Sequence, residues 1–283
     1  MIFLSKNYIT FLNQKNIAVS LFSQMSSTAH KESLSPSNQS QGKDSACCLC
    51  SLPLLSSSIG RKWIVAGTGI LLVLFVIGHL LGNLTIFPGP NWINAYAEHL
   101  QSLGPFLWVI RLILLTIVGL HITCTILLWH ENRIANPRKY AVENTLKTTI
   151  YARSMRLTGL VFIAFVIFHL AHLTWQGFNP ETRTWVDAEG RHDVYRMLIA
   201  AFSNPFISAF YILSVGLLAM HLSHGIASLF QTLGITSAKL RPLFEGGGRI
   251  VAWLIFAGYA SIPLAVLLGI LRYPHASACS FCH

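Results

Sequence analysis

Five long apolar stretches dominate the pattern of hydrophobic and polar positions along the chain. Each holds about 20 residues or more, the length of helix that crosses the roughly 30 Å hydrocarbon core of a membrane. Backbone polar groups in lipid have to satisfy one another, so each stretch is expected to be a helix. The pattern therefore predicts an all-α fold, a five-helix transmembrane bundle. The predicted spans are approximately 63–87, 106–129, 157–175, 205–230 and 250–271.

The segments outside the spans differ in composition. From about position 20, residues 1–58 are rich in Ser with Pro, Gln and Lys. Such a segment buries too little apolar surface to fold, so we expect a disordered N-terminal extension. A membrane domain at 59–273 and a short C-terminal tail at 274–283 complete the predicted organisation. The first 25 residues lack the continuous apolar centre of a secretory signal, and Met25 stays open as an alternative start.

Charge is scarce, basic and concentrated between the spans. The 283 residues are 53% hydrophobic and only 11% charged, with a net charge of +10. A soluble domain carries about 25% charged residues, and nucleic-acid binding needs Lys and Arg spread over a folded surface, so both classes are disfavoured. The loop between spans two and three holds six basic residues, whereas the loop at 88–105 holds none. This bias predicts a multi-pass inner-membrane protein with a cytoplasmic N-terminus, an outer C-terminus and basic loops near anionic lipid.

Six histidines lie within the predicted spans, where Arg111 is the single Asp, Glu, Lys or Arg. Ionisable groups are costly in a membrane and mark function. His79 and His169 each lie about seven residues from the outer end of their spans, and His121 and His221 lie about nine residues from the inner end. These positions form two layers, each with one histidine from two helices. Because a neutral imidazole supplies a lone pair to iron, the layers predict two stacked b-type haems with two histidine ligands each.

Nearby residues leave alternatives open. His172 and His224 follow His169 and His221 by three residues, so each is either a replacement ligand or a partner of a haem propionate. Arg111 either extends toward the lipid surface or pairs with a propionate of the outer haem. Glycines near the histidines suit either a flat porphyrin or close helix packing. These glycines are Gly78, Gly82, Gly119, Gly216 and Gly225.

At these histidines the chain resembles the five-helix, di-haem cytochrome b anchor subunit of succinate:quinone oxidoreductases, the succinate dehydrogenases and fumarate reductases. The matching segments are VIGHLLGNL, HLQSLGPF, GLHITCTILLW, FVIFHLAHLTW and MHLSHGIASLFQTLGIT, within residues 60–272. The resemblance implies that His121 and His221 bind the proximal, inner haem and that His79 and His169 bind the distal, outer haem. It also implies a cytoplasmic flavoprotein and an iron–sulfur protein as partners, and quinone, of the menaquinone type, as substrate. The chain itself carries no dinucleotide or iron–sulfur motif, so it is expected to do no succinate chemistry alone.

Quinone reduction also needs protons, and one carboxylate is a candidate donor. Glu98, in the loop before span two, corresponds approximately to an acidic position that the family places near a quinone site. His99 is its fallback, and a solvated loop carboxylate is the alternative. The terminal Cys279-Ser280-Phe281-Cys282-His283 matches the C-x-x-C-H pattern of covalent haem attachment. Because the sequence stops at that histidine and leaves no residues to enclose a haem, an unstructured or disulfide-forming tail is favoured instead.

Two other functions remain open from the sequence. A cytochrome b anchor of another respiratory complex, of the hydrogenase or formate dehydrogenase type, shares the electron-transfer role with different partners. A proton-coupled transporter would use membrane histidines as relays, and predicts scattered polar groups and broken helices near mid-membrane.

Overall fold

The computed structural model describes residues 56–135, 150–235 and 237–273. These ranges are helical, with one isolated antiparallel bridge between Val186 and His192. Within them, five helical segments are long and apolar enough to cross a membrane, as the sequence predicts. They are α3 (Ser58–Leu84), α5 (Pro105–Ala135), α6 (Ile150–His169) with its continuation η3 (Leu170–Thr174), α8 (Pro205–Thr232) and α9 (Leu240–Leu267). The predicted tail 274–283, and all but the last three residues of the predicted extension, lie outside the described residues.

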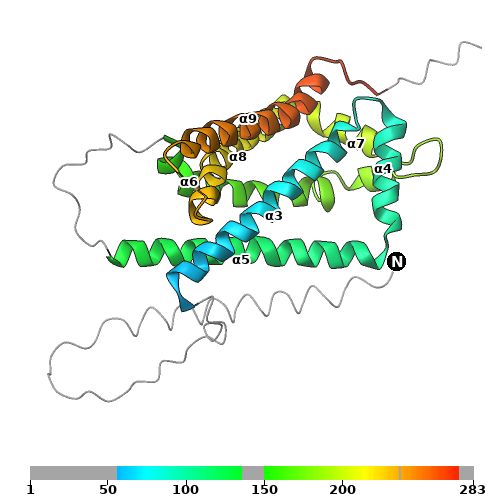
Figure 1. Cartoon of the computed structure of the whole chain (residues 1–283). Coiled ribbons are helices and arrows are strands. Elements are labelled where there is room, and N and C mark those ends of the chain that lie inside the picture. The colour runs from blue at the N-terminus through cyan, green and yellow to red at the C-terminus, as the bar shows by residue number, and fades with distance from the viewer. Residues whose placement is uncertain (1–55, 136–149, 236, 274–283) are drawn as a thin grey trace, which may run out of the picture. The chain divides into compact units, whose positions relative to one another are not determined.

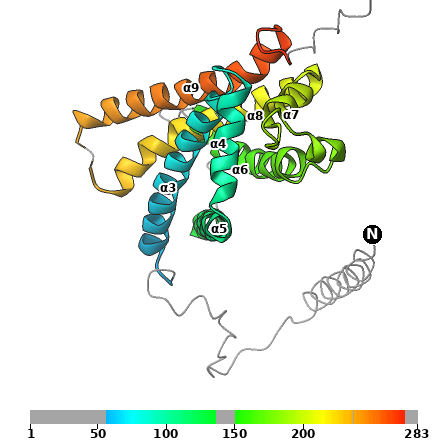
Figure 2. The same ribbon diagram turned by 90° about the vertical axis from the view of Figure 1, so that its right-hand side faces the viewer.

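The helices pack around one antiparallel hairpin. α8 and α9 make the most extensive helix–helix contact, α6 packs on α8, and α3 packs on both α8 and α9 (Figure 1). α5 packs mainly on α3, and Figure 2, which looks along α5, shows it set apart from α8 and α9. Cys124 is the one buried residue of α5, as expected for a small apolar side chain. The exposed apolar side chains of α5 suit a helix surrounded by lipid.

Local sequence signals set where the helices begin. The Ser57 hydroxyl accepts a hydrogen bond from the Gly60 N–H at 3.0 Å and caps α3. Asn204 caps α8 in the same way, and a proline follows it at the first helical position. Both arrangements satisfy N–H groups that the helix itself leaves unpaired.

One end of the bundle carries short helices, and we call it the cap end. It comprises α4 (Pro90–Ser102), the 3₁₀ helix η4 (Pro180–Thr184) and α7 (Val194–Phe202). The sequence predicts a loop at 88–105, and α4 corrects this expectation. A proline at its first position and a buried side chain at Ile93 favour this helix. Buried residues of α4, α6, α7, α8 and α9 share one apolar cluster at this end.

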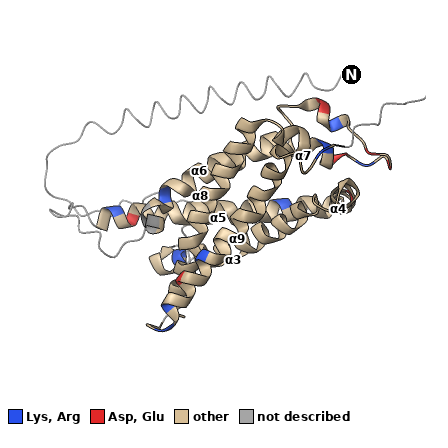
Figure 3. Cartoon of the chain, turned by 90° about the horizontal axis from the view of Figure 1, so that it is seen from above, with Lys and Arg blue, Asp and Glu red and all other residues tan. Residues whose placement is uncertain are grey.

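The largest departures from the predicted spans lie in α9 and α6. α9 begins at Leu240, ahead of the predicted position 250, and an Arg241–Glu245 ion pair at 2.8 Å stabilises its first turns. α6 does not continue as an α-helix through 175: after His169 it changes to the π-helix η3. Figure 3 shows that charged residues occur mainly toward the helix ends and around α7, so the middle of the bundle is largely uncharged.

Candidate functional site

His79 of α3 and His169 of α6 form a pair near the cap end. Their ring centres lie 6.0 Å apart and their planes are at 89°. Phe75 stacks on the His79 ring at 5.5 Å, and Tyr259 of α9 lies 6.2 Å from it. A metal ion lies about 2 Å from an imidazole nitrogen, so two imidazoles on opposite sides of one metal have ring centres about 6 Å apart. The spacing of this pair therefore fits a shared metal.

His121 of α5 and His221 of α8 lie at a second level, farther from the cap. His121 packs against Gly69 of α3 and His221 against Gly159 of α6, and each glycine precedes the histidine of the first pair on its own helix by ten residues. His121 Nδ1 is hydrogen-bonded to Thr68 Oγ1 of α3 at 2.9 Å. Thr68 and His79 are eleven residues apart on α3, which corresponds to about 16 Å along the helix axis. The structure thus places the four histidines at two levels of the bundle, each level joining two helices.

Two ring nitrogens in this group lack a hydrogen-bond partner within the described part of the chain. His169 Nδ1 and His221 Nδ1 are both buried and have no hydrogen-bond partner in this part of the chain. The Met155 backbone does face the His221 ring. Buried polar atoms are nearly always hydrogen-bonded, so such atoms ask for an explanation. A ligand that reorients the ring, or that brings its own polar groups, explains them.

Glycines lie against two of the rings. A β-carbon added at Gly69 would lie 3.6 Å from Cε1 of His121, and one at Gly159 would lie 3.4 Å from Cε1 of His221. Neither glycine is among those that the sequence singled out. Gly78, by contrast, faces open space, and Gly82 packs on the Tyr96 ring of α4. The glycines that matter for the rings are those on the helix opposite each histidine, which sequence neighbourhood alone does not reveal.

The residues present fit two bis-imidazole haems. Each level supplies two imidazoles from facing helices, and a haem needs only two axial side chains because the porphyrin supplies the other ligands. Among the described residues, no three His, Cys, Asp or Glu side chains come together as a site for a bare metal ion.

His172 has a different partner from His169. Its Nδ1 is hydrogen-bonded at 2.9 Å to the Tyr211 hydroxyl of α8, and the side chain is buried. The π-turn that begins after His169 carries His172 to this position, and π-turns are frequent at functional sites. Tyr211 also contacts the His169 ring, with centres 5.9 Å apart. His224 interacts electrostatically with Glu245 of α9.

The remaining candidates lie on exposed surfaces. Glu98 is an exposed residue of α4, close enough to Arg191 for an electrostatic interaction, and His99 beside it is exposed as well. Arg111 is exposed on α5, with its guanidinium 4.9 Å from the centre of the Trp108 ring. This cation–π contact accords with an arginine that extends along the helix toward the membrane surface.

A buried polar network joins the parts of the cap. The Asn94 side chain of α4 donates to Asp187 and to Asp193 at 3.2 Å and accepts from the Tyr195 N–H at 3.0 Å. Burial alone would raise the pKa of Asp187, but hydrogen bonds from Arg191 and its neighbours outweigh burial and lower that pKa to about 2. The network ties α4 to the segment before α7.

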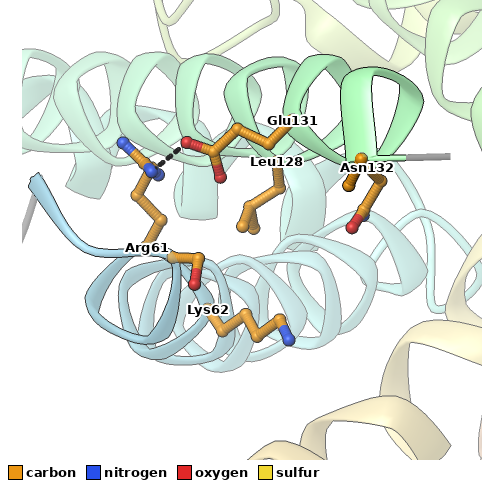
Figure 4. Close-up of a pocket in the computed structure, with 7 residues that line it drawn as sticks. Arg61, Lys62, Leu128, Glu131 and Asn132 are labelled. Carbon is orange, nitrogen blue, oxygen red and sulfur yellow. Dashed lines mark hydrogen bonds and ion pairs between the residues drawn. The ribbon is translucent and has the colours of Figure 1, made fainter. Parts of the chain in front are cut away.

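Charged side chains line a pocket at the opposite end of α3 and α5. It has a volume of about 430 Å³ and is lined by both helices, with Arg61 ion-paired to Glu131 (Figure 4). Lys62 lines the same pocket, and Trp63 beside it is half exposed. Trp and Lys at this height are typical of a membrane–water interface.

The terminal C-x-x-C-H pattern, Cys279 to His283, lies outside the described residues. Comparison with protein-family models, curated proteins and solved structures found no match for this chain.

Proposed function

We propose that the chain is the membrane-anchor cytochrome b subunit of a succinate:quinone oxidoreductase. In this role it passes electrons between an iron–sulfur partner and quinone through two haem b groups. The observation that carries the proposal is the contact of the His79 and His169 rings, whose centres lie 6.0 Å apart, together with the position of His121 and His221 at a second level. Scattered relays of a transporter would not require histidines at two such levels.

Each histidine has a proposed role as a haem iron ligand. His79 and His169 would hold the haem nearer the cap, and His121 and His221 the haem nearer the opposite end. A bound bis-imidazole haem supplies a one-electron carrier. The protein contributes the ligand spacing, the apolar surroundings and the glycine surfaces at Gly69 and Gly159.

Charge distribution supports an orientation with the cap outside. Away from the cap end, the side chains that the structure describes include seven basic ones and two acidic ones, Glu131 and Glu245. The basic ones are Arg61, Lys62, Arg133, Arg156, Lys239, Arg241 and Arg249. Cap arginines are matched locally: Arg191 pairs with Asp187 and Glu189, and Arg196 lies 4.1 Å above the Trp185 ring. The unbalanced basic end is the one expected in the cytoplasm, where it would face the flavoprotein and iron–sulfur partners.

Quinone, of the menaquinone type, would react near the cap-end haem. Glu98 lies on the cap helix α4 and is exposed, so it has access to protons from water. The Glu98 carboxylate is our candidate for proton exchange with the quinone.

A reduced-minus-oxidised spectrum of the full-length protein, purified from membranes, tests the proposal. Two b-type haems per chain are expected. The absence of haem, which the transporter alternative predicts, would refute the proposal. Co-purification with a flavoprotein that oxidises succinate is the second expectation. A haem-containing chain that co-purifies with a hydrogenase or formate dehydrogenase would instead identify another respiratory anchor.

A further inference from the structure

Thr68 has an unusual position for a membrane threonine. It lies on α3 with only 8% of its surface exposed, and its hydroxyl contacts His121 Nδ1 of α5 at 2.9 Å. The same hydroxyl lies 2.7 Å from the Ile64 carbonyl and 3.2 Å from the Val65 carbonyl. Within the described residues, no other side chain is hydrogen-bonded to the ring of His79, His121, His169 or His221.

Counting protons assigns the direction of this hydrogen bond. A threonine hydroxyl has one proton to donate and two lone pairs that accept. The short contact to the Ile64 carbonyl uses that proton, because a carbonyl oxygen accepts only. The hydroxyl then has to accept from His121, so Nδ1 carries the proton. The Val65 backbone, which also faces the His121 ring, is an acceptor too and agrees with this assignment.

We propose that Thr68 is the positioning residue for His121, holding its ring in the Nδ1–H tautomer and leaving the Nε2 lone pair free to bind iron. This inference rests on the proposed function. A hydrogen bond from the far nitrogen makes an imidazole a stronger electron donor and so favours oxidised iron. His221 Nδ1 makes no hydrogen bond to a side chain of the described residues, and the Met155 backbone faces its ring instead. Among the described residues, only His121 of these two ligands therefore has a hydroxyl partner.

The test is a redox titration of the full-length protein in its purified complex, with three substitutions. His121→Ala removes one haem and thereby identifies the midpoint potential that belongs to this level. Thr68→Val keeps the shape of the side chain and removes the hydroxyl, so that midpoint potential is expected to rise. The potential of the other haem is expected to stay in place. Thr68→Ser, which keeps the hydroxyl, is expected to restore the original value.

A matched control separates the hydrogen bond from packing. Thr232 of α8 is half-buried, and its hydroxyl donates to the Ser228 carbonyl of its own helix. Thr232→Val is expected to leave both potentials unchanged. A shift of the same size in Thr232→Val, or an unchanged potential in Thr68→Val, would overturn the inference. If Thr68→Val does not fold, Thr68→Ala removes the same hydroxyl, and the same rise in midpoint potential is expected.

Haem content separates this inference from the function on which it rests. An unmodified protein without haem would refute the proposed function. If the unmodified protein holds two haems, and the spectra and potentials of both are unchanged in Thr68→Val, only the role of Thr68 is refuted. Electron paramagnetic resonance of the oxidised protein is a second readout, because the signal of the affected haem is expected to change when its ligand loses the hydrogen bond.

Discussion

Asn94 joins three parts of the cap through a single buried side chain. It is 1% exposed and hydrogen-bonds Asp187, Asp193 and the Tyr195 N–H. Asn94→Ala removes all three hydrogen bonds at once and leaves the backbone of α4 unchanged. The substitution therefore measures how strongly α4 is held to the segment that leads into α7.

The expected loss in the free energy of unfolding depends on which hydrogen bonds each partner of Asn94 keeps after the substitution. The Tyr195 N–H is left buried without an acceptor, which costs about 1–3 kcal/mol. Asp187 keeps its hydrogen bonds from Arg191, and Asp193 keeps those from the Arg196 N–H and the Tyr273 hydroxyl. Each carboxylate thus loses only part of its support. With about 1 kcal/mol for each of the two lost hydrogen bonds to a carboxylate, the total is about 3–5 kcal/mol. This is a large share of the roughly 5–15 kcal/mol that stabilises a typical domain.

Unfolding of the purified protein in mixed micelles with increasing SDS, followed by tryptophan fluorescence, measures this loss. Asn91→Ala is the control, because Asn91 is an exposed residue of the same helix with a 2.8 Å bond to Arg191. Its expected cost is below about 1 kcal/mol. Equal losses in the two variants, or a loss below about 1 kcal/mol for Asn94→Ala, would refute the idea that the buried network holds α4 in place.

Three further outcomes are expected. His79→Ala and His221→Ala each lower the haem content from two to one per chain, and loss of both haems in either variant would contradict two independent levels. Glu98→Gln lowers quinone turnover while both haem spectra stay intact, and unchanged turnover would remove Glu98 from the quinone site. Because the pKa of Asp187 is lowered from 3.8 to about 2, its contribution to stability is complete above its ordinary pKa and is lost as pH falls toward about 2. The unfolding curve of Asp187→Asn is expected to lack that acid-dependent loss, measured between pH 5 and about 2 against the unmodified protein.

The spans were predictable because a membrane leaves a helix few alternatives. Long apolar windows located all five helices that are long and apolar enough to span a membrane, and counting residues from their ends placed His79 and His169 at one depth. The structure brings these two rings together. Depth along a helix depends only on a constant rise per residue, so errors of a few residues at the ends do not change the pairing.

The cap and the surroundings of the rings were not predictable in the same way. α4 is a short segment that mixes polar with apolar residues, and its anchor is one asparagine whose partners lie more than 90 residues away in sequence. Thr68 and Gly69 approach His121 from another helix, so nothing near His121 in sequence points to them. Contacts of this kind depend on how helices are rotated against each other, which a pattern of apolar residues leaves undetermined.

The π-turn after His169 has a consequence for comparing this chain with others. A π-turn holds one residue more per turn than an α-turn, so in evolutionary terms it equals the insertion of one residue. A related chain without the π-turn would be one residue shorter between His169 and Gln176. The residue equivalent to His172 would then lie on a different face of the helix. Alignments anchored on His169 should therefore admit a one-residue gap within Leu170–Thr174.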